Sequence, residues 1–309
     1  MEPNKVIEAL EQLNKESFDL FETKEMEMTR ELISLKNKMA KGIIWYPITR
    51  YRRKRALSKI PSVTHSTNWT EDKWRSLMHE GDPSKRAVVY TCITGNYDSA
   101  QKPLYYTDHC DYIMFSECTE TIAPNGWRAC EIPESIKDIG NNVMINRYIK
   151  MHPHELFEKE YDYSIYIDGN IRPITDLSVL CELINEKVGV AFHKHSSRIS
   201  IYDEIRACQI LNKGNVTKLR EQGERYRKEY FPSQFGMAEC NVIITDLHST
   251  EARKILTAWW EEFLRSGSGR DQISLPYILW KTGHTIEEIA TLGDNSTKNP
   301  KIQFCAHTT

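Results

Sequence analysis

The chain has 309 residues, 40% of them hydrophobic and 27% charged, and its formal net charge is −2 at pH 7. This composition is typical of a soluble globular protein with one large domain or two small ones. The apolar runs are too short to span a bilayer and Met1 is not followed by a signal-peptide pattern, so we expect a cytoplasmic protein. None of the 8 cysteines forms a C-x-x-C pair, which argues against a zinc ribbon or a redox motif.

The first part of the chain differs in composition from the rest. Residues 1–41 are rich in Glu, Lys, Leu and Met and predict a helix. That helix either forms a homo-oligomer or docks on a partner, or it packs on its own domain. Residues 42–62 combine aromatic and aliphatic side chains with a basic cluster, and residues 62–84 form a polar bridge into the main domain.

Positive charge is concentrated in one block. No acidic residue lies between Leu32 and Thr70, whereas that stretch carries nine basic ones: Lys36, Lys38, Lys41, Arg50, Arg52, Arg53, Lys54, Arg55 and Lys59. Basic residues beside aromatic ones suit peripheral contact with an anionic membrane, here its inner face. A solvated basic linker is the alternative. Nucleic-acid binding is disfavoured because no recognised binding module accompanies the block.

From Arg86 onward, strands alternate with helices, which predicts an α/β sheet. Strands are expected over residues 87–94, 112–116, 164–168, 188–192 and 241–245. Helices are expected over residues 142–157, 202–212, 249–266 and 271–282.

The most informative motif follows the predicted strand at 164–168. The strand ends in Asp168, Gly169 allows a tight turn, and Asn170 adds a second side-chain oxygen. Two oxygen ligands at a strand end suit a hard divalent cation, which in turn can hold the diphosphate of a sugar nucleotide. The alternative is a polar β-turn, because Asp, Gly and Asn are common turn residues.

A second polar turn follows the first predicted strand, at Thr94, Gly95, Asn96 and Tyr97. Ligands of open α/β sheets bind beyond the carboxyl ends of the strands, so these residues suit a nucleotide base and ribose. A simple strand-to-loop turn is the alternative. The chain contains neither G-x-G-x-x-G nor a P-loop motif, which argues against the usual dinucleotide and P-loop folds.

The ordered motifs of residues 86–285 resemble those of the plant mucilage-related and turgor-regulation hexosyltransferase-like family, which also has bacterial members. The resemblance begins with Val89-Tyr90-Thr91-Cys92-Ile93-Thr94-Gly95-Asn96-Tyr97-Asp98. It continues, in order, through Asn146–His154, Ile165–Ile171, Phe192–His195, Ile201–Glu204, Gly236–Glu239, Trp259-Trp260 and Arg270–Ser274. Residues 1–85 and the last ~20 lie outside the match.

The resemblance implies a nucleotide-sugar glycosyltransferase of the GT-A fold, with a Rossmann-like mixed sheet flanked by helices. It also implies a cation, Mn²⁺ or Mg²⁺, at an Asp-x-Asp motif, which is Asp-Gly-Asn here and so has one carboxylate fewer. Asp168 and Asn170 are then metal ligands, and His307 is a candidate third ligand because several GT-A families close the site with a late histidine. A lone terminal histidine without a role is the alternative.

Other residues receive donor-binding roles through the same resemblance. Arg147 and Lys150 are three residues apart on one helix and share a face, which suits the diphosphate or the donor sugar; a solvated helix face is the alternative. The resemblance implies that His193, and His195 two residues later, either bind the substrate or contact the residues that bind it. Gln272 is a further candidate for the donor.

Two carboxylates are candidates for the general base of an inverting reaction. Glu239 precedes the predicted strand at 241–245, and Asp271 opens the helix at 271–282. Either could take the proton of the acceptor hydroxyl, whereas a retaining reaction would not need this base. Asp271 could instead cap its helix.

Three regions and one function follow from these observations. We expect a helical and basic extension over 1–61, a linker over 62–85, and the GT-A-like domain over 86–309. The expected activity is metal-dependent transfer of a hexose from a nucleoside-diphosphate sugar to a glycan or lipid-linked acceptor, in surface polysaccharide synthesis. A catalytically silent sugar-binding scaffold, assembled through the N-terminal helix, is the alternative.

Overall fold

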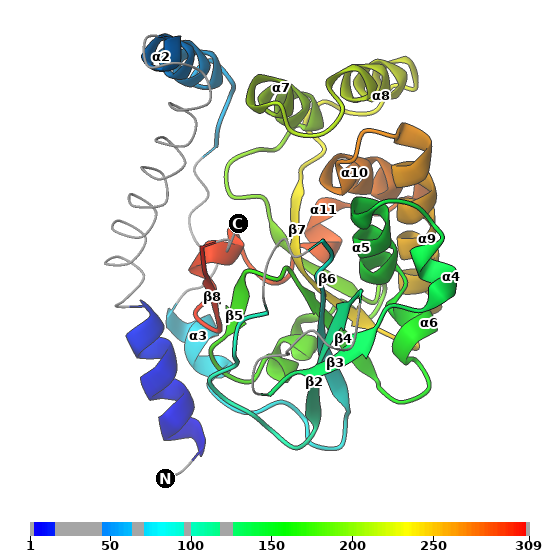
Figure 1. Cartoon of the computed structure of the whole chain (residues 1–309). Helices are drawn as coiled ribbons and strands as arrows, with labels where there is room; N and C mark the ends of the chain where they lie inside the picture. The colour runs from blue at the N-terminus through cyan, green and yellow to red at the C-terminus, as the bar shows by residue number, and fades with distance from the viewer. Residues whose placement is uncertain (1–2, 16–44, 64–70, 96–99, 118–125, 307–309) are drawn as a thin grey trace.

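A computed structural model describes residues 3–15, 45–63, 71–95, 100–117 and 126–306 of the chain, without the side chains of 45–47 and 71. A six-stranded mixed sheet lies at its centre (Figure 1). The strand order is β3-β2-β1-β4-β7-β6. These strands are β1 (Ala87–Cys92), β2 (Cys110–Ser116), β3 (Arg128–Glu131), β4 (Tyr163–Ile167), β6 (Val190–Lys194) and β7 (Ala238–Asp246).

The direction of the strands decides which ends meet. β1 pairs in parallel with β2 and β4, and β2 pairs in parallel with β3. β7 is antiparallel to both β4 and β6, so β6 runs in the same direction as β4. The carboxyl ends of β1, β4 and β6 therefore meet at one edge of the sheet. The predicted α/β fold with a mixed sheet is confirmed.

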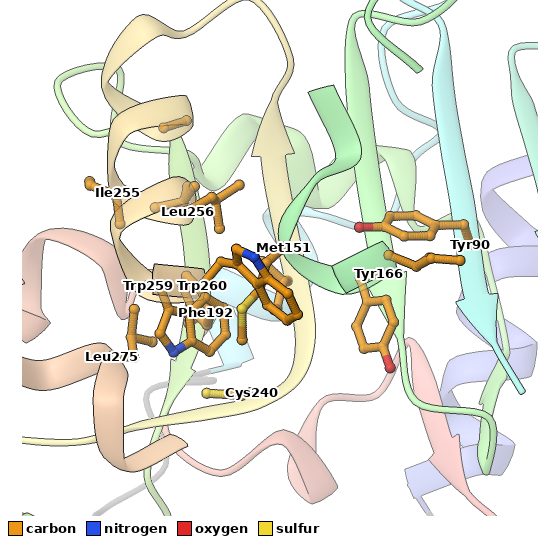
Figure 2. Close-up of a cluster of buried hydrophobic side chains, with 14 of the residues drawn as sticks. Tyr90, Met151, Tyr166, Phe192, Cys240, Ile255, Leu256, Trp259, Trp260 and Leu275 are labelled. Carbon is orange, nitrogen blue, oxygen red and sulfur yellow. The ribbon is translucent and has the colours of Figure 1, made fainter. Parts of the chain in front are cut away.

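Helices cover one face of the sheet with a large apolar core. They are α5 (Asn142–Met151), α6 (Pro153–Phe157), α9 (Thr250–Ser266) and α10 (Asp271–Thr282). Figure 2 shows Trp259 and Trp260 of α9 between Leu275 of α10 and Met151 of α5. The helix predicted over 142–157 is broken at His152, because Pro153 cannot continue the α5 hydrogen bonds and begins α6 instead.

The opposite face of the sheet is covered by a second apolar cluster. It includes Val89, Ile165 and Ile244 from the sheet together with Leu177 and Leu180. The last two belong to the segment around the short helix η1 (Ser178–Leu183). A small two-stranded sheet adjoins this face, formed by β5 (Ile171–Pro173) and β8 (Ile302–Phe304).

A third apolar cluster lies under two helices that follow β6, α7 (Ile201–Leu211) and α8 (Val216–Lys228). Tyr226 stacks on Tyr277 of α10 with ring centroids 3.9 Å apart, which ties α8 to the main core. The remaining short helices are α3 (Glu71–Ser76), α4 (Glu134–Lys137), α11 (Ile286–Ile289) and η2 (Ser296–Lys298).

The N-terminal helix, residues 3–15, packs on the α/β domain rather than standing apart from it (Figure 1). Ile7 and Glu11 are fully buried, and the Glu11 carboxylate lies 2.7 Å from Nζ of the fully buried Lys301. Asn14 donates from Nδ2 to the carbonyl oxygens of Pro300 and Ile302. Of the alternatives for residues 1–41, packing on its own domain holds for 3–15; residues 16–41 lie outside the described part.

The predicted linker at 62–85 also joins the folded body. Trp74 of α3 is 4% exposed, Leu77 is buried beside it, and the Trp74 indole donates to the Glu11 carboxylate. In contrast, α2 (Trp45–Leu57) exposes its basic side chains from Arg50 to Arg55. None of the described helices is long and apolar enough to cross a membrane.

Candidate functional site

A cavity of about 500 Å³ lies at the carboxyl edge of the sheet. Residues that follow β1 form one part of its lining, and Asp168, Gly169 and Asn170, which follow β4, form another. The first turns of α5 contribute the third wall through Asn142, Val143, Asn146 and Arg147. The polar turns that follow β1 and β4 therefore line one cavity, at the edge where ligands of open α/β sheets bind.

Asp168 is held at the end of β4 by backbone and side-chain contacts. Its backbone N–H donates to the carbonyl of Asn241 on β7 at 2.9 Å, and the Tyr166 hydroxyl donates to its Oδ1 at 3.1 Å. Burial and the Asp168 carboxylate both raise the pKa of Tyr166, so this phenol stays a donor. Oδ2 of Asp168 has no hydrogen-bond partner among the described residues.

Asn170 is oriented by the last described residues of the chain. Its Nδ2 donates to the carbonyl of Cys305 at 3.3 Å, and its own carbonyl accepts from the Cys305 N–H at 2.8 Å. This pairing continues the β5–β8 ladder, in which Ile171 faces Phe304. Nδ2 is thus engaged, whereas Oδ1 has no hydrogen-bond partner in the part of the chain that the structure describes. His307 lies outside the described residues, two positions beyond Cys305.

Arg147 and Lys150 of α5 share one face, as predicted, and that face meets Asp271 at the start of α10. Lys150 Nζ lies 2.8 Å from Asp271 Oδ2, and Arg147 Nε lies 3.0 Å from the same oxygen, away from the ideal hydrogen-bond direction. Lys150 is 2% exposed, so the alternative of a solvated helix face does not apply to it. Arg147 lines the cavity, whereas Lys150 does not.

This ion cluster changes the interpretation of Asp271. Burial raises the pKa of Asp271, but the Arg147 and Lys150 cations outweigh that effect and hold the pKa well below its usual range. A carboxylate so stabilised is a weak proton acceptor, and it does not line the cavity. Asp271 does not cap α10 either, because Arg270 is the N-cap residue and no side chain caps the helix.

Glu239 of β7 is also engaged within the fold. Its Oε2 accepts from Ser296 N–H at 2.9 Å and from Ser296 Oγ at 2.5 Å, and its Oε1 accepts from the Ser196 N–H at 3.0 Å. Burial opposes its ionisation, but the Ser296 hydrogen bonds prevail and lower the pKa of Glu239. Glu239 does not line the cavity.

His193 and Gln272 lie behind the cavity rather than in its lining. His193 is fully buried, its Nε2 lies 3.1 Å from Asn299 Nδ2, and burial lowers its pKa to about 4. Gln272 donates from Nε2 to the Ala238 carbonyl at 3.0 Å. Both side chains thus support β6 and β7, so a direct donor contact is not what this geometry favours.

The turn after β1 places Thr94 and Gly95 in the cavity lining, while Asn96 and Tyr97 lie outside the described residues. Thr94 Oγ1 donates to the Asn142 carbonyl at 3.3 Å. Gly95 has φ +65°, and a Cβ there would meet Asn142 Nδ2 at 2.5 Å. The positive φ favours glycine, and the absence of a side chain leaves room for the Asn142 amide beside the β1 turn.

Asn146 is a site residue that the sequence reasoning missed. Its Nδ2 donates to the Cys92 carbonyl at 2.7 Å and lies 3.4 Å from the Tyr166 hydroxyl, and its Oδ1 accepts from Arg147. It therefore joins the ends of β1 and β4 to the arginine. The available signal was an amide directly before Arg147, one turn after the Asn141 cap that begins α5.

The donor set fits a hard cation at Asp168 and Asn170. Among the described residues, one carboxylate oxygen and one amide oxygen have no hydrogen-bond partner, and oxygen ligands of this kind suit Mg²⁺ or Mn²⁺. No cluster of three or more His, Cys, Asp or Glu side chains that could hold a metal occurs in the part of the chain that the structure describes.

The mixed sheet, with a polar cavity at its carboxyl edge, defines an α/β protein of the kind that binds ligands beyond its strand ends. The sequence model of the TOD1/MUCI70, glycosyltransferase-like domain matches residues 126–299, which is more than half of the chain. The chain belongs to this glycosyltransferase-like family, which supports glycosyltransferase activity in general and confirms the predicted resemblance.

No curated protein matches the chain. Among solved structures, the apo form of mouse xyloside xylosyltransferase 1 is 10% identical, with 66% of this chain and 83% of that chain covered at a TM-score of 0.37.

Proposed function

We propose that the protein is a metal-dependent glycosyltransferase of GT-A type that moves a hexose from a nucleoside-diphosphate sugar to a glycan or lipid-linked acceptor. One observation carries the proposal. Asp168 and Asn170 each have a side-chain oxygen that no described residue engages, on one wall of a cavity of about 500 Å³, and Arg147 lies on another wall. A diphosphate needs both partners, because a cation and a guanidinium together neutralise its charge.

The residues of the cavity have distinct tasks in this proposal. Arg147 binds diphosphate oxygens and stabilises the charge that develops on the leaving group. Asp271 is a positioning residue, because it holds Arg147 and Lys150 on one oxygen and leaves the triad with one net positive charge. A cation bound at Asp168 and Asn170 would supply Lewis-acid stabilisation of the same phosphates.

The acceptor and its location belong to the same proposal. The exposed basic side chains of α2 suit an anionic membrane surface, where a lipid-linked acceptor would reside. Each basic residue near such a surface contributes about 1 kcal/mol, so the helix would hold the protein there reversibly. Surface polysaccharide synthesis at the inner face of the membrane is the process that fits these elements.

Donor hydrolysis tests the function without knowledge of the acceptor. The wild-type protein, Asp168→Ala and the control Asp108→Ala would be incubated with a panel of UDP-, GDP- and TDP-hexoses, with and without Mn²⁺. Asp108 is an exposed residue outside the cavity. We expect Mn²⁺-dependent release of nucleoside diphosphate from one donor by wild type and control, and its loss in Asp168→Ala.

Thermal shift with the same donors separates the two functions that the sequence allowed. A donor that raises the melting temperature without being cleaved would indicate the silent scaffold. Turnover by Asp168→Ala at the wild-type rate would show that the cation site is assigned wrongly.

A further inference from the structure

A second cavity, of about 630 Å³, lies between the segment that follows α2 and the α7–α8 pair. Pro61 and Val63 form one side, and the Val63 N–H donates to the Ser197 carbonyl at 2.9 Å, which fixes this segment to the chain after β6. Because β6 runs in the same direction as β4, this cavity lies at the same edge of the sheet as the cavity lined by Arg147, Asp168 and Asn170, which is called the donor-side cavity below.

The start of α7 leaves polar side chains free for this cavity. Ser200 is the N-cap residue and Asp203 follows three positions later, a spacing that normally forms a capping box. Here the Ser200 side chain makes no cap hydrogen bond, and Asp203 makes no hydrogen bond or ion pair with any residue in the described ranges. Both residues line the cavity instead, and they contribute a hydroxyl and a carboxylate to its lining.

Donors face these acceptors from α8. The Arg227 guanidinium lies over the Tyr202 ring at 4.3 Å from the centroid, and no described carboxylate pairs with it. Stacking orients a guanidinium while its N–H groups remain free to donate. Phe231 and Pro61 add apolar surface to the same lining.

This combination distinguishes between classes of ligand. A phosphate would be attracted by the Arg227 cation and repelled by the Asp203 carboxylate. Because these two charges cancel, the cavity offers an anion no net attraction. A sugar ring carries adjacent hydroxyls that donate to a carboxylate and accept from a guanidinium, and its C–H faces pack on apolar walls. The lining therefore matches a hydroxyl-rich saccharide better than an anionic headgroup.

We propose that this second cavity binds a sugar unit of the acceptor glycan, at a distance from the unit that receives the hexose. The proposal rests on the glycosyltransferase function above. A series of hydrogen bonds begins at Asp168 in the lining of the donor-side cavity. It continues to Asn241, Ser296, Glu239 and Ser196, and Ser196 precedes Ser197 in the lining of the second cavity. The N-terminal part of the chain thus completes a substrate site through Pro61 and Val63.

Binding can be measured without any donor by saturation-transfer difference NMR. The probes are neutral tetrasaccharides: cellotetraose, maltotetraose, xylotetraose and β-1,4-galactotetraose. We expect at least one to give a signal with wild type and with Arg220→Ala, an exposed arginine of α8 outside the cavity. Asp203→Asn should weaken that signal at least fivefold, and Ser233→Trp, which fills the mouth from an exposed position, should abolish it.

Two results would overturn the proposal: no probe binds, or binding survives Ser233→Trp and Asp203→Asn. Binding of phosphatidylglycerol vesicles that Ser233→Trp abolishes, with no tetrasaccharide signal, would assign the cavity to a lipid headgroup instead. Donor hydrolysis by Ser233→Trp should remain at the wild-type rate, because the donor-side cavity is untouched. Failure of hydrolysis in wild type would reject the proposed function, while the NMR result would still decide on the second cavity.

Discussion

Replacing Glu11 by Ala should destabilise the whole protein, although Glu11 lies near the start of the chain. Its carboxylate accepts from Lys301 Nζ at 2.7 Å, from the Trp74 indole at 2.6 Å and from Thr175 Oγ1 at 2.7 Å, and both charges are fully buried. Removing one partner leaves the Lys301 ammonium buried without its counter-charge, which typically costs 3–5 kcal/mol. That is a large part of the ~5–15 kcal/mol by which native proteins are stable.

Urea unfolding measures this loss. We expect the midpoint of Glu11→Ala to fall by about 1–5 M if m lies near 1–3 kcal/mol/M, while m itself is unchanged. The matched control is Glu8→Ala, which removes an exposed glutamate from the same helix. The double variant Glu11→Leu/Lys301→Met should recover most of the loss, because it removes both charges and keeps the volume. Equal midpoints for Glu11→Ala and Glu8→Ala would refute the docking of this helix.

Three further outcomes are expected. Arg147→Ala should weaken donor binding by ~1.5–3 kcal/mol in calorimetry, and unchanged affinity would show that Arg147 does not bind the donor. Lys150→Met should lower the stability of the protein more than its affinity for the donor. Between pH 6.5 and 4, His193 is protonated in the unfolded chain but not in the folded protein. The free energy of unfolding should therefore decrease as the pH is lowered, by up to about 3 kcal/mol at ~1.4 kcal/mol per pKa unit. His193→Gln should reduce this pH dependence in urea titrations. Serine at Arg52, Arg53 and Arg55 should reduce co-sedimentation with anionic liposomes at low salt, and binding equal to wild type would leave α2 without this role.

Much of the sheet and its helices could be predicted from local pattern. Residues 87–92, 164–167 and 242–244 read as strands because they are apolar and β-favouring, and the structure buries them. The strand-end position of Asp168 and the helical spacing of Arg147 and Lys150 follow from the same kind of pattern. Helix α8 was missed although Asn215 caps it and its buried residues lie three and four positions apart.

The roles of buried polar groups could not be predicted in the same way. Whether Asp271 is a base, a cap or an ion-pair partner depends on α5 and α10 meeting across the core, which no local pattern records. The same holds for Asn146 and Tyr166, which read as ordinary helix and strand residues. The contacts of Asn14 span 286 and 288 residues of sequence, so composition alone suggested a separate extension.

The junction between the first helix and β8 has a consequence for biosynthesis. Glu11 and Lys301 are 290 positions apart, so the glutamate leaves the ribosome long before its partner exists. Contacts of such separation form late, because their loop-closure entropy is offset only when the intervening chain has folded. The Cys305 contact that orients Asn170 comes from the same last segment. Truncation before Lys301 would therefore remove both the ion pair that docks the first helix and the contact that orients Asn170, so neither could form during synthesis until this segment had been made.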